Sequence, residues 1–226
     1  MAPTTPLPFL NRTDAGRQLA AKLAQYSHHQ SKNLLILTLP RGGVPVGAEV
    51  AKILNAPLDV FTIRKLGVPG NEELAFGAIA SGNTQILNDD IIQLLNISQS
   101  TIDQIAAKER AELFRRENVY RPNRPPIDTA NRTVILIDDG LATGASMRAA
   151  AIAVRRMNPA RLIIAVPVAA AETCDLMRSF ADELVCLYMP EPFLSVSFWY
   201  KDFSPTTDAD VLRSINTLKR EFRRYT

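Results

Sequence analysis

Two adjacent carboxylates, Asp138 and Asp139, directly follow the apolar residues 134–137, and a loop of small residues, GLATGAS, occupies positions 140–146. The two glycines of that loop permit positive φ angles and close approach of the backbone to a ligand. If a helix begins after this loop, the free backbone N–H groups of 143–146 form a cradle suited to a phosphate. Carboxylates bind vicinal hydroxyl groups or a hard cation, so the stretch combines that function with anion binding.

A ribose 5-phosphate satisfies both ends of this stretch, with its 2′ and 3′ hydroxyls on the carboxylates and its phosphate in the cradle. The stretch is not a nucleotide P-loop, because no Gly-Lys-Ser/Thr sequence follows. The alternative interpretation is an ordinary turn from strand to helix with acidic residues near the helix start. We favour the sugar-phosphate site, because four apolar residues, two acids and Ala-Thr-Gly-Ala-Ser come in this order.

A second candidate loop, Arg41-Gly42-Gly43, follows the apolar residues 33–40. It offers a guanidinium group and two unencumbered backbone N–H groups just after a predicted strand. Both kinds of donor suit a pyrophosphate. An ordinary connection between a strand and a helix is the alternative.

Two further cations, Arg64 and Lys65, come at the end of the predicted strand 57–66. The residues that follow, 67–73, are rich in glycine and proline and predict a mobile loop. A lid of this kind can carry cations over a leaving group and exclude water. A solvated strand end is the alternative.

Alternating strands and helices are expected to position these residues. The expected strands cover 33–40, 57–66, 133–139, 161–169 and 183–189. The expected helices cover 14–26 after an N-cap at Thr13, the residues up to 54, 98–118, 146–157, 172–181 and the residues after Thr207. Continuous apolar strands alternating with helices predict an α/β fold with a mainly parallel sheet flanked by helices. Ligands bind at the carboxyl edge of such a sheet, where Arg41, 64–65, 138–146 and 167–170 are expected.

An insertion of about 89–130 interrupts this alternation. A hairpin turn is predicted at 81–83, and Ser98 is the expected N-cap of the long helix that follows. Basic and acidic residues alternate along this helix, namely Lys108, Arg110, Arg115 and Arg116 with Glu109, Glu112 and Glu117. The pattern is typical of an exposed face with salt bridges. A dimer contact and an additional substrate lid are alternatives.

The length of 226 residues suits a single domain, 1–226. A small hood is expected from about 183–206 together with a C-terminal helix, 207–226. Its aromatic residues could stack on a flat ring or pack the hood onto the core, and they include Phe193, Phe198, Trp199 and Tyr200.

Composition excludes several classes of protein. A hydrophobic content of 46% and a charged content of 22% are those of a globular domain. The net charge of +3 is too small to indicate nucleic-acid binding. The two cysteines, Cys174 and Cys186, lack the spacing of a zinc site or a disulfide framework and are expected to be reduced thiols. The sequence predicts neither a signal peptide nor a membrane span, so we expect a cytoplasmic protein.

The sequence resembles the type I phosphoribosyltransferases. VILIDDGLATGAS is similar to their motif for phosphoribosyl pyrophosphate, and LTLPRGGVPVG is similar to their pyrophosphate loop. RKLGVPGNEELAFGAIA is similar to their flexible catalytic loop and the strand after it. With DAGRQLA and the residues Tyr200, Asp202 and Phe203, the resemblance covers most of the chain. The resemblance is greatest to a bacterial branch whose members are usually described as phosphoribosyltransferases without a named substrate.

This resemblance implies a Mg²⁺-dependent enzyme that transfers the phosphoribosyl group of 5-phosphoribosyl 1-pyrophosphate to a nitrogenous base and releases pyrophosphate. The catalytic residues that it implies are Arg64, Lys65 and Asp139. The substrate-binding residues are Arg41, Gly42, Gly43, Asp138, Asp139, Ala142, Thr143, Gly144, Ala145 and Ser146. Asp138 and Asp139 are the candidate metal ligands. The partners implied are small molecules, with no nucleic acid or membrane, and a second copy in a homodimer.

One position departs from part of the family. Transferases for 6-oxopurines carry an acidic residue directly before the Thr-Gly pair, where this chain has Ala142. The local string is closer to the adenine and uracil types, which counts against hypoxanthine or guanine as the acceptor. A regulator that binds the donor without catalysis, and an enzyme that uses no base at all, are the alternative functions.

Overall fold

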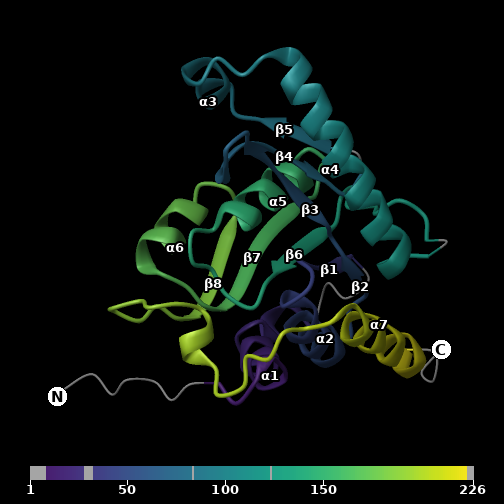
Figure 1. Ribbon diagram of the computed structural model, residues 1–226. Helices are drawn as coiled ribbons and strands as arrows, with labels where there is room; N and C mark the ends of the chain where they lie inside the picture. The colour runs from purple at the N-terminus through teal and green to yellow at the C-terminus, as the bar shows by residue number, and fades with distance from the viewer. Residues whose placement is uncertain (1–8, 28–32, 83, 123, 223–226) are drawn as a thin grey trace.

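A five-stranded parallel sheet forms the centre of the protein in the computed structural model, which describes residues 9–27, 33–82, 84–122 and 124–222 (Figure 1). The strands lie in the order β2-β1-β6-β7-β8 and are all parallel. Their bounds are β1 (Leu34–Thr38), β2 (Leu58–Val60), β6 (Thr133–Ile137), β7 (Arg161–Val168) and β8 (Glu183–Tyr188). The predicted α/β fold with a mainly parallel sheet is therefore confirmed. The strand predicted over 183–189 is confirmed as the edge strand β8, so residues 183–188 belong to the sheet and not to the expected hood.

Helices cover both faces of this sheet (Figure 1). On one face, α1 (Arg12–Lys22) and α2 (Gly43–Leu54) pack on alternate strand residues such as Ile36 and Ile135. On the other face, α5 (Ala145–Arg155) and α6 (Ala171–Met177) pack on the intervening residues. Every residue of β1 and β6 is buried. Burial on both faces explains why these strands read as continuous apolar runs.

A second sheet, antiparallel and in the order β3-β4-β5, is attached to the first. It consists of β3 (Ile63–Val68), β4 (Asn71–Ala80) and β5 (Thr84–Leu87). The prediction of one strand over 57–66 is wrong, because the chain leaves the parallel sheet after β2 and starts β3 in the other sheet. The hairpin turn predicted at 81–83 is confirmed by the pairing of Ala80 with Thr84, although Asn83 itself lies outside the described residues.

The prediction of a loop over 67–73 is also wrong. Val68 pairs with Asn71, so only Pro69 and Gly70 form the connection between β3 and β4. Gly70 has a φ of +79°, and proline followed by such a glycine is the sequence of a tight type II turn. The apolar residues Leu66 and Phe76 hold the hairpin together by packing beneath α4.

The insertion consists of α3 (Asp89–Leu94) and α4 (Gln99–Tyr120). The side chain of Ser98 caps α4, as predicted, by accepting a hydrogen bond from the N–H of Thr101. Figure 1 shows α4 running along the antiparallel sheet towards α7 (Asp208–Phe222). Its far end, Tyr120, is buried with Val60 of β2 and Ile215 of α7. The helix therefore bridges the small sheet and the main domain.

Two N-caps decide how the chain enters the terminal helices. The N-cap of α1 is Asn11 and not Thr13, because Asn11 Oδ1 accepts a hydrogen bond of 2.9 Å from the N–H of Asp14. The helix therefore begins two residues earlier than predicted. Thr207 caps α7 as predicted, because Thr207 and Asp210 exchange side-chain to backbone hydrogen bonds.

The remaining short elements are the 3₁₀ turns η1 (Ala24–Tyr26) and η2 (Ser197–Trp199). Cys174 and Cys186 are both free thiols. Among the described residues, no helix combines the length and the apolar character needed to cross a membrane.

Candidate functional site

Asp139 lies at the centre of the carboxyl edge of the sheet, one residue beyond Asp138. Its Oδ2 is 2.7 Å from Nε of Arg12 on α1, and the side chains of this pair are 16% and 11% exposed. Arg12 also donates to the carbonyl oxygen of Ser204 at 2.8 Å, and its guanidinium carbon lies 3.8 Å from the ring centroid of Phe203. Arg12 was missed from the sequence, although it lies only two residues before the DAGRQLA segment.

Burial governs the ionisation of the two carboxylates. It raises the pKa of Asp138 well above its usual range, and the neighbouring charge of Asp139 raises it further. Burial raises the pKa of Asp139 as well, while the guanidinium group of Arg12 acts in the opposite direction. Hydroxyl donors or a cation supplied by a ligand would stabilise the charged form of both groups.

The loop between β1 and α2 makes close contact with Asp139. A Cβ atom at Gly42 would lie 2.0 Å from Asp139 Oδ2, and one at Gly43 would lie 2.8 Å from the carbonyl oxygen of Ile137. Only glycine allows this approach. The peptide bond before Arg41 is cis. The structure thus brings together two of the predicted groups of site residues, at 41–43 and 138–139.

The C-terminal segment covers the same edge from the other side. The hydroxyl group of Tyr200 donates a hydrogen bond to the carbonyl oxygen of Asp139 at 2.6 Å. A Cβ atom at Gly140 would lie 2.6 Å from Val196. Trp199 and Tyr200 are buried and pack this segment onto the core, whereas Phe198 is 59% exposed. Of these three aromatic side chains, Phe198 is the one that a ligand can reach.

The predicted phosphate cradle directly precedes α5. Gly144 is the N-cap of this helix and has a φ of +69°. The first N–H groups of a helix have no acceptor within the helix, and here they belong to exposed residues, Ala145 and Ser146. Thr173 of α6 donates to the carbonyl oxygen of Ala142 at 2.5 Å and so fixes the preceding turn. The N–H of Ala145 donates a long hydrogen bond of 3.5 Å to Thr143 Oγ1, and the side chains of Thr143, Ala145 and Ser146 are exposed.

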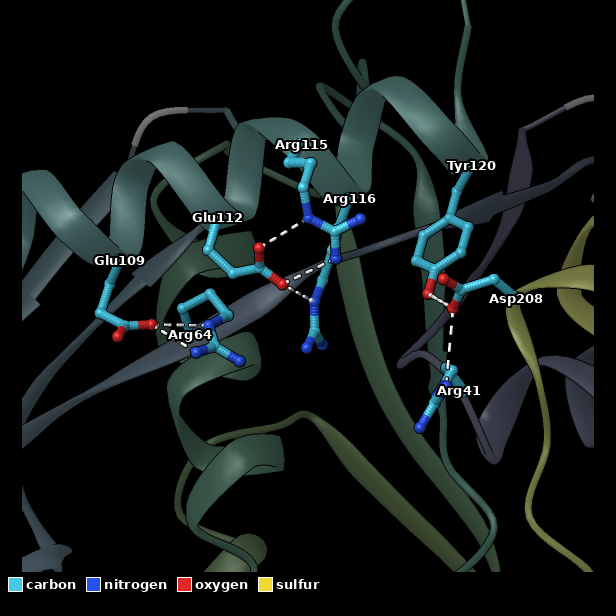
Figure 2. A network of polar contacts seen from close by, with 8 residues as sticks. All are labelled: Arg41, Arg64, Glu109, Glu112, Arg115, Arg116, Tyr120 and Asp208. Atoms are coloured by element: carbon cyan, nitrogen blue, oxygen red, sulfur yellow. Dashed lines mark hydrogen bonds and ion pairs between the residues drawn. The ribbon is translucent and has the colours of Figure 1, made fainter.

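Arg64 and Lys65 lie inside β3, not at the end of a strand of the parallel sheet. Arg64 is turned towards α4, where its Nη2 is 2.6 Å from Oε2 of Glu109 (Figure 2). Lys65 is exposed and lines a cavity of about 810 Å³ together with Ser146. The structure therefore brings Lys65 to a cavity wall shared with the phosphate cradle, whereas the guanidinium group of Arg64 is held by α4.

Arg41 is also paired within the protein. Its Nη1 is 3.7 Å from Oδ1 of Asp208 at the start of α7. The same carboxylate oxygen accepts a hydrogen bond of 2.6 Å from the hydroxyl group of Tyr120, at the end of α4 (Figure 2). Tyr120 and Asp208 were missed from the sequence, and Glu109 was named only as part of an exposed face with salt bridges. The residues that all three contact lie far away along the chain.

The profile of the phosphoribosyl transferase domain matches residues 10–187. The chain belongs to this family. Two proteins of Mycobacterium tuberculosis, from strains CDC 1551 and H37Rv and each named "Putative phosphoribosyl transferase", are 42% identical to it over 214 residues. The alignment covers 95% of this chain and 48% of theirs, so the chain spans about half the length of these relatives.

Two solved structures share the fold of this chain. The crystal structure of TT1426 from Thermus thermophilus is 39% identical, with a TM-score of 0.82, and the match covers 94% of this chain and 99% of that one. The AQ2163 protein from Aquifex aeolicus shares the fold at 11% identity, with a TM-score of 0.51 and coverage of 90% and 86%.

The carboxylates of this phosphoribosyl transferase domain suit a metal only in part. Among the described residues, no cluster of three or more His, Cys, Asp or Glu side chains could enclose an ion. Asp138 Oδ1 accepts from the N–H of Asp139, and Asp139 Oδ2 is paired with Arg12. One oxygen of each carboxylate is left without a hydrogen-bond partner in the described part of the chain. Such a donor set fits Mg²⁺ if phosphate oxygens and water complete its coordination.

Proposed function

We propose that the protein transfers the phosphoribosyl group of 5-phosphoribosyl 1-pyrophosphate to a nitrogenous base and releases pyrophosphate. The observation that carries this proposal is the contact of two loops at one sheet edge, where Gly42 abuts the carboxylate of Asp139. One loop offers carboxylates and a helix N-terminus, and the other offers a cation and bare backbone. A sugar with a phosphate on one side and a pyrophosphate on the other requires this combination.

In this proposal each part of the donor has its own binding residues. Asp138 and Asp139 hold the ribose hydroxyls, and the backbone of 142–146, with the hydroxyls of Thr143 and Ser146, holds the 5′-phosphate. The pyrophosphate is held by Arg41, Gly42 and Gly43, with Arg64 and Lys65 from the β3–β4 hairpin.

The reaction breaks the bond between C1 of the ribose and the pyrophosphate oxygen and forms a bond from C1 to a ring nitrogen. Positive charge develops on the sugar, as it does in glycoside cleavage. The negative charge of Asp139 stabilises that charge, while Lys65 and Arg41 stabilise the negative charge that collects on the leaving group. The hairpin limits the access of water, which would otherwise hydrolyse the donor.

We propose Mg²⁺ as the cofactor, held by the free oxygens of Asp138 and Asp139 together with oxygens of the donor. When bound, the ion neutralises phosphate charge and helps to orient the leaving group. Burial raises the pKa of both carboxyl groups, and a bound cation would lower it again and so favour the charged forms.

The acceptor is proposed to be a base other than a 6-oxopurine. Ala142 is exposed at the start of the phosphate cradle and provides no carboxylate there. Phe198 is an exposed aromatic side chain on the covering segment and is available for stacking on a flat ring.

The test is the release of pyrophosphate from the donor in the presence of Mg²⁺, with and without a panel of bases. We expect release that depends on one base and that is lost in Asp139→Asn. Saturable binding of the donor without turnover on any base would favour the alternative function, a non-catalytic regulator. If the donor did not bind and Asp139→Asn changed nothing, both functions would be refuted.

The proposed partners are the two small-molecule substrates and a second copy of the chain. The homodimer is proposed from the resemblance to the type I phosphoribosyltransferases. Analytical ultracentrifugation would test it against the monomer mass of 24.9 kDa. We also propose the cytoplasm as its compartment, because Cys174 and Cys186 are both free thiols.

A further inference from the structure

One stripe of α4 faces the cavity of about 810 Å³ that lies beside Lys65 and Ser146. Thr101, Ile105 and Lys108 succeed one another at helical spacing on the wall of this cavity. Glu109, which borders the same cavity, holds Arg64 (Figure 2). The insertion therefore forms a wall of the space that the hairpin and the phosphate cradle enclose.

The rotation of α4 about its axis is fixed by its buried face. Ile102, Ala106 and Leu113 are 3–4% exposed and pack on the hairpin residues Leu66 and Phe76. Because of this packing, Lys108 remains on the neighbouring, exposed stripe that borders the cavity.

The acidic residues closest to Lys108 along α4 are already paired with arginines. Glu112, one turn further along, accepts hydrogen bonds from Arg115 at 2.7 and 2.9 Å and from Arg116 at 2.8 Å (Figure 2). Glu109 is bonded to Arg64 at 2.7 Å. Within the part of the chain that the structure describes, Lys108 makes no ion pair.

The balance of charge in the cavity follows from these pairs. Arg64 and Glu109 neutralise each other, which leaves the ammonium groups of Lys65 and Lys108 on its lining. Ser146 adds a hydroxyl group and belongs to the first turn of α5, whose free N–H groups favour an anion. Two cations and Ser146, from the first turn of α5, thus border one space.

We propose that Lys108 is an anion-binding residue of this site and contacts a phosphate group held between α4, Lys65 and the start of α5. The inference rests on the proposed function, because the phosphate belongs to the sugar-phosphate donor. The group is either its 5′-phosphate or its pyrophosphate, which share the same oxyanion chemistry. A lysine on a flexible stem suits this role as a point charge.

Calorimetric titration of the full chain tests the assignment. The probes are inorganic pyrophosphate, ribose 5-phosphate and 5-phosphoribosyl 1-pyrophosphate, each with Mg²⁺. The variants are Lys108→Gln, Lys108→Arg and, as a matched control, Lys22→Gln, which removes the same charge from an exposed position at the far end of α1. Thermal unfolding of each variant checks that its fold is intact.

We expect Lys108→Gln to weaken binding of the donor about tenfold, Lys108→Arg to retain most of the affinity, and Lys22→Gln to bind as the wild type does. Selective loss of pyrophosphate binding would assign Lys108 to the pyrophosphate, and selective loss of ribose 5-phosphate binding would assign it to the 5′-phosphate. Unchanged binding in Lys108→Gln, or an equal loss in Lys22→Gln, would overturn this inference alone. A wild type that binds none of the probes would overturn the proposed function itself.

Discussion

The hydroxyl group of Tyr120 donates a hydrogen bond of 2.6 Å to Asp208, which joins the last turn of α4 to the first turn of α7. Arg41 lies 3.7 Å from the same carboxylate oxygen. Burial and this hydrogen bond raise the pKa of Tyr120 to about 12. The contact therefore links a residue of the candidate site to the ionisation of a tyrosine.

This link predicts a loss of stability in alkali. Because the folded pKa of Tyr120 exceeds the unfolded value of about 10, its contribution to stability is complete below pH 10 and is lost between about pH 10 and pH 12. In Tyr120→Phe that part of the pH dependence should be absent. Urea denaturation at several pH values measures it, and an unchanged alkaline profile in the variant would contradict the assignment.

Removal of the guanidinium group in Arg12→Met should leave a buried carboxylate without its partner. We expect a loss of about 3 kcal/mol in the free energy of unfolding at pH 7, because the Arg12–Asp139 pair is largely shielded from water. Without the arginine the pKa of Asp139 rises further above its unfolded value. The loss should therefore shrink as the pH falls and the carboxylate is protonated.

Denaturation of Arg12→Met and of the wild type at pH 7 and pH 5 tests whether the loss of stability is smaller at the lower pH. A difference between the two proteins that grew on acidification would show that Asp139 is not the group responsible.

Gly42→Ala should disrupt the site itself. The new Cβ would lie 2.0 Å from Asp139 Oδ2, so either the loop or the carboxylate must move. We expect a destabilisation of about 1–3 kcal/mol, as for other overpacked positions, and loss of donor binding. Donor titration and thermal unfolding measure the two effects. Retained affinity would mean that the contact between the loops is not required for binding.

Glu109→Gln should weaken the hold on Arg64 and lower kcat/KM about tenfold, with the greater part of the change in kcat. Glu112→Gln is the matched control on the same helix, because Glu112 binds Arg115 and Arg116 and not a residue of the hairpin. If Glu109 acts by positioning Arg64, Glu109→Asp should recover part of the rate, because it keeps a carboxylate at this position. Equal losses in both glutamine variants would instead indicate a general effect of charge on α4.

The sequence predicted best those elements that follow one another directly along the chain. The strand, loop and helix around Asp138 and Ser146 are consecutive, so residue types and spacing are enough to place them. The contacts that were missed join residues far apart, with separations of 127 for Arg12 and Asp139 and 88 for Tyr120 and Asp208. No periodicity within one segment contains that information.

The hairpin shows a different limit of prediction. Glycine and proline in 67–73 indicate that the chain turns, but not how few residues the turn uses. Pro69 and Gly70 form the turn itself. The pairing of β3 with β4 beside it is irregular, with register shifts between Leu66 and Val68, and Leu66 and Phe76 pack under α4. Tertiary packing, absent from the local pattern, converted an expected loop into strands.

The length of α4 has a mechanical consequence. Its 22 residues span about 33 Å, with Ile102, Ala106 and Leu113 against the hairpin and Tyr120 embedded beside Val60 and Ile215. Because Tyr120 is buried at the C-terminal end of α4, the helix could tilt about that residue. A tilt of about 5° at that residue carries the opposite end through about 3 Å. We therefore expect a tilt of α4 at its contact with α7 to move the hairpin that carries Lys65, because Ile102, Ala106 and Leu113 pack on that hairpin.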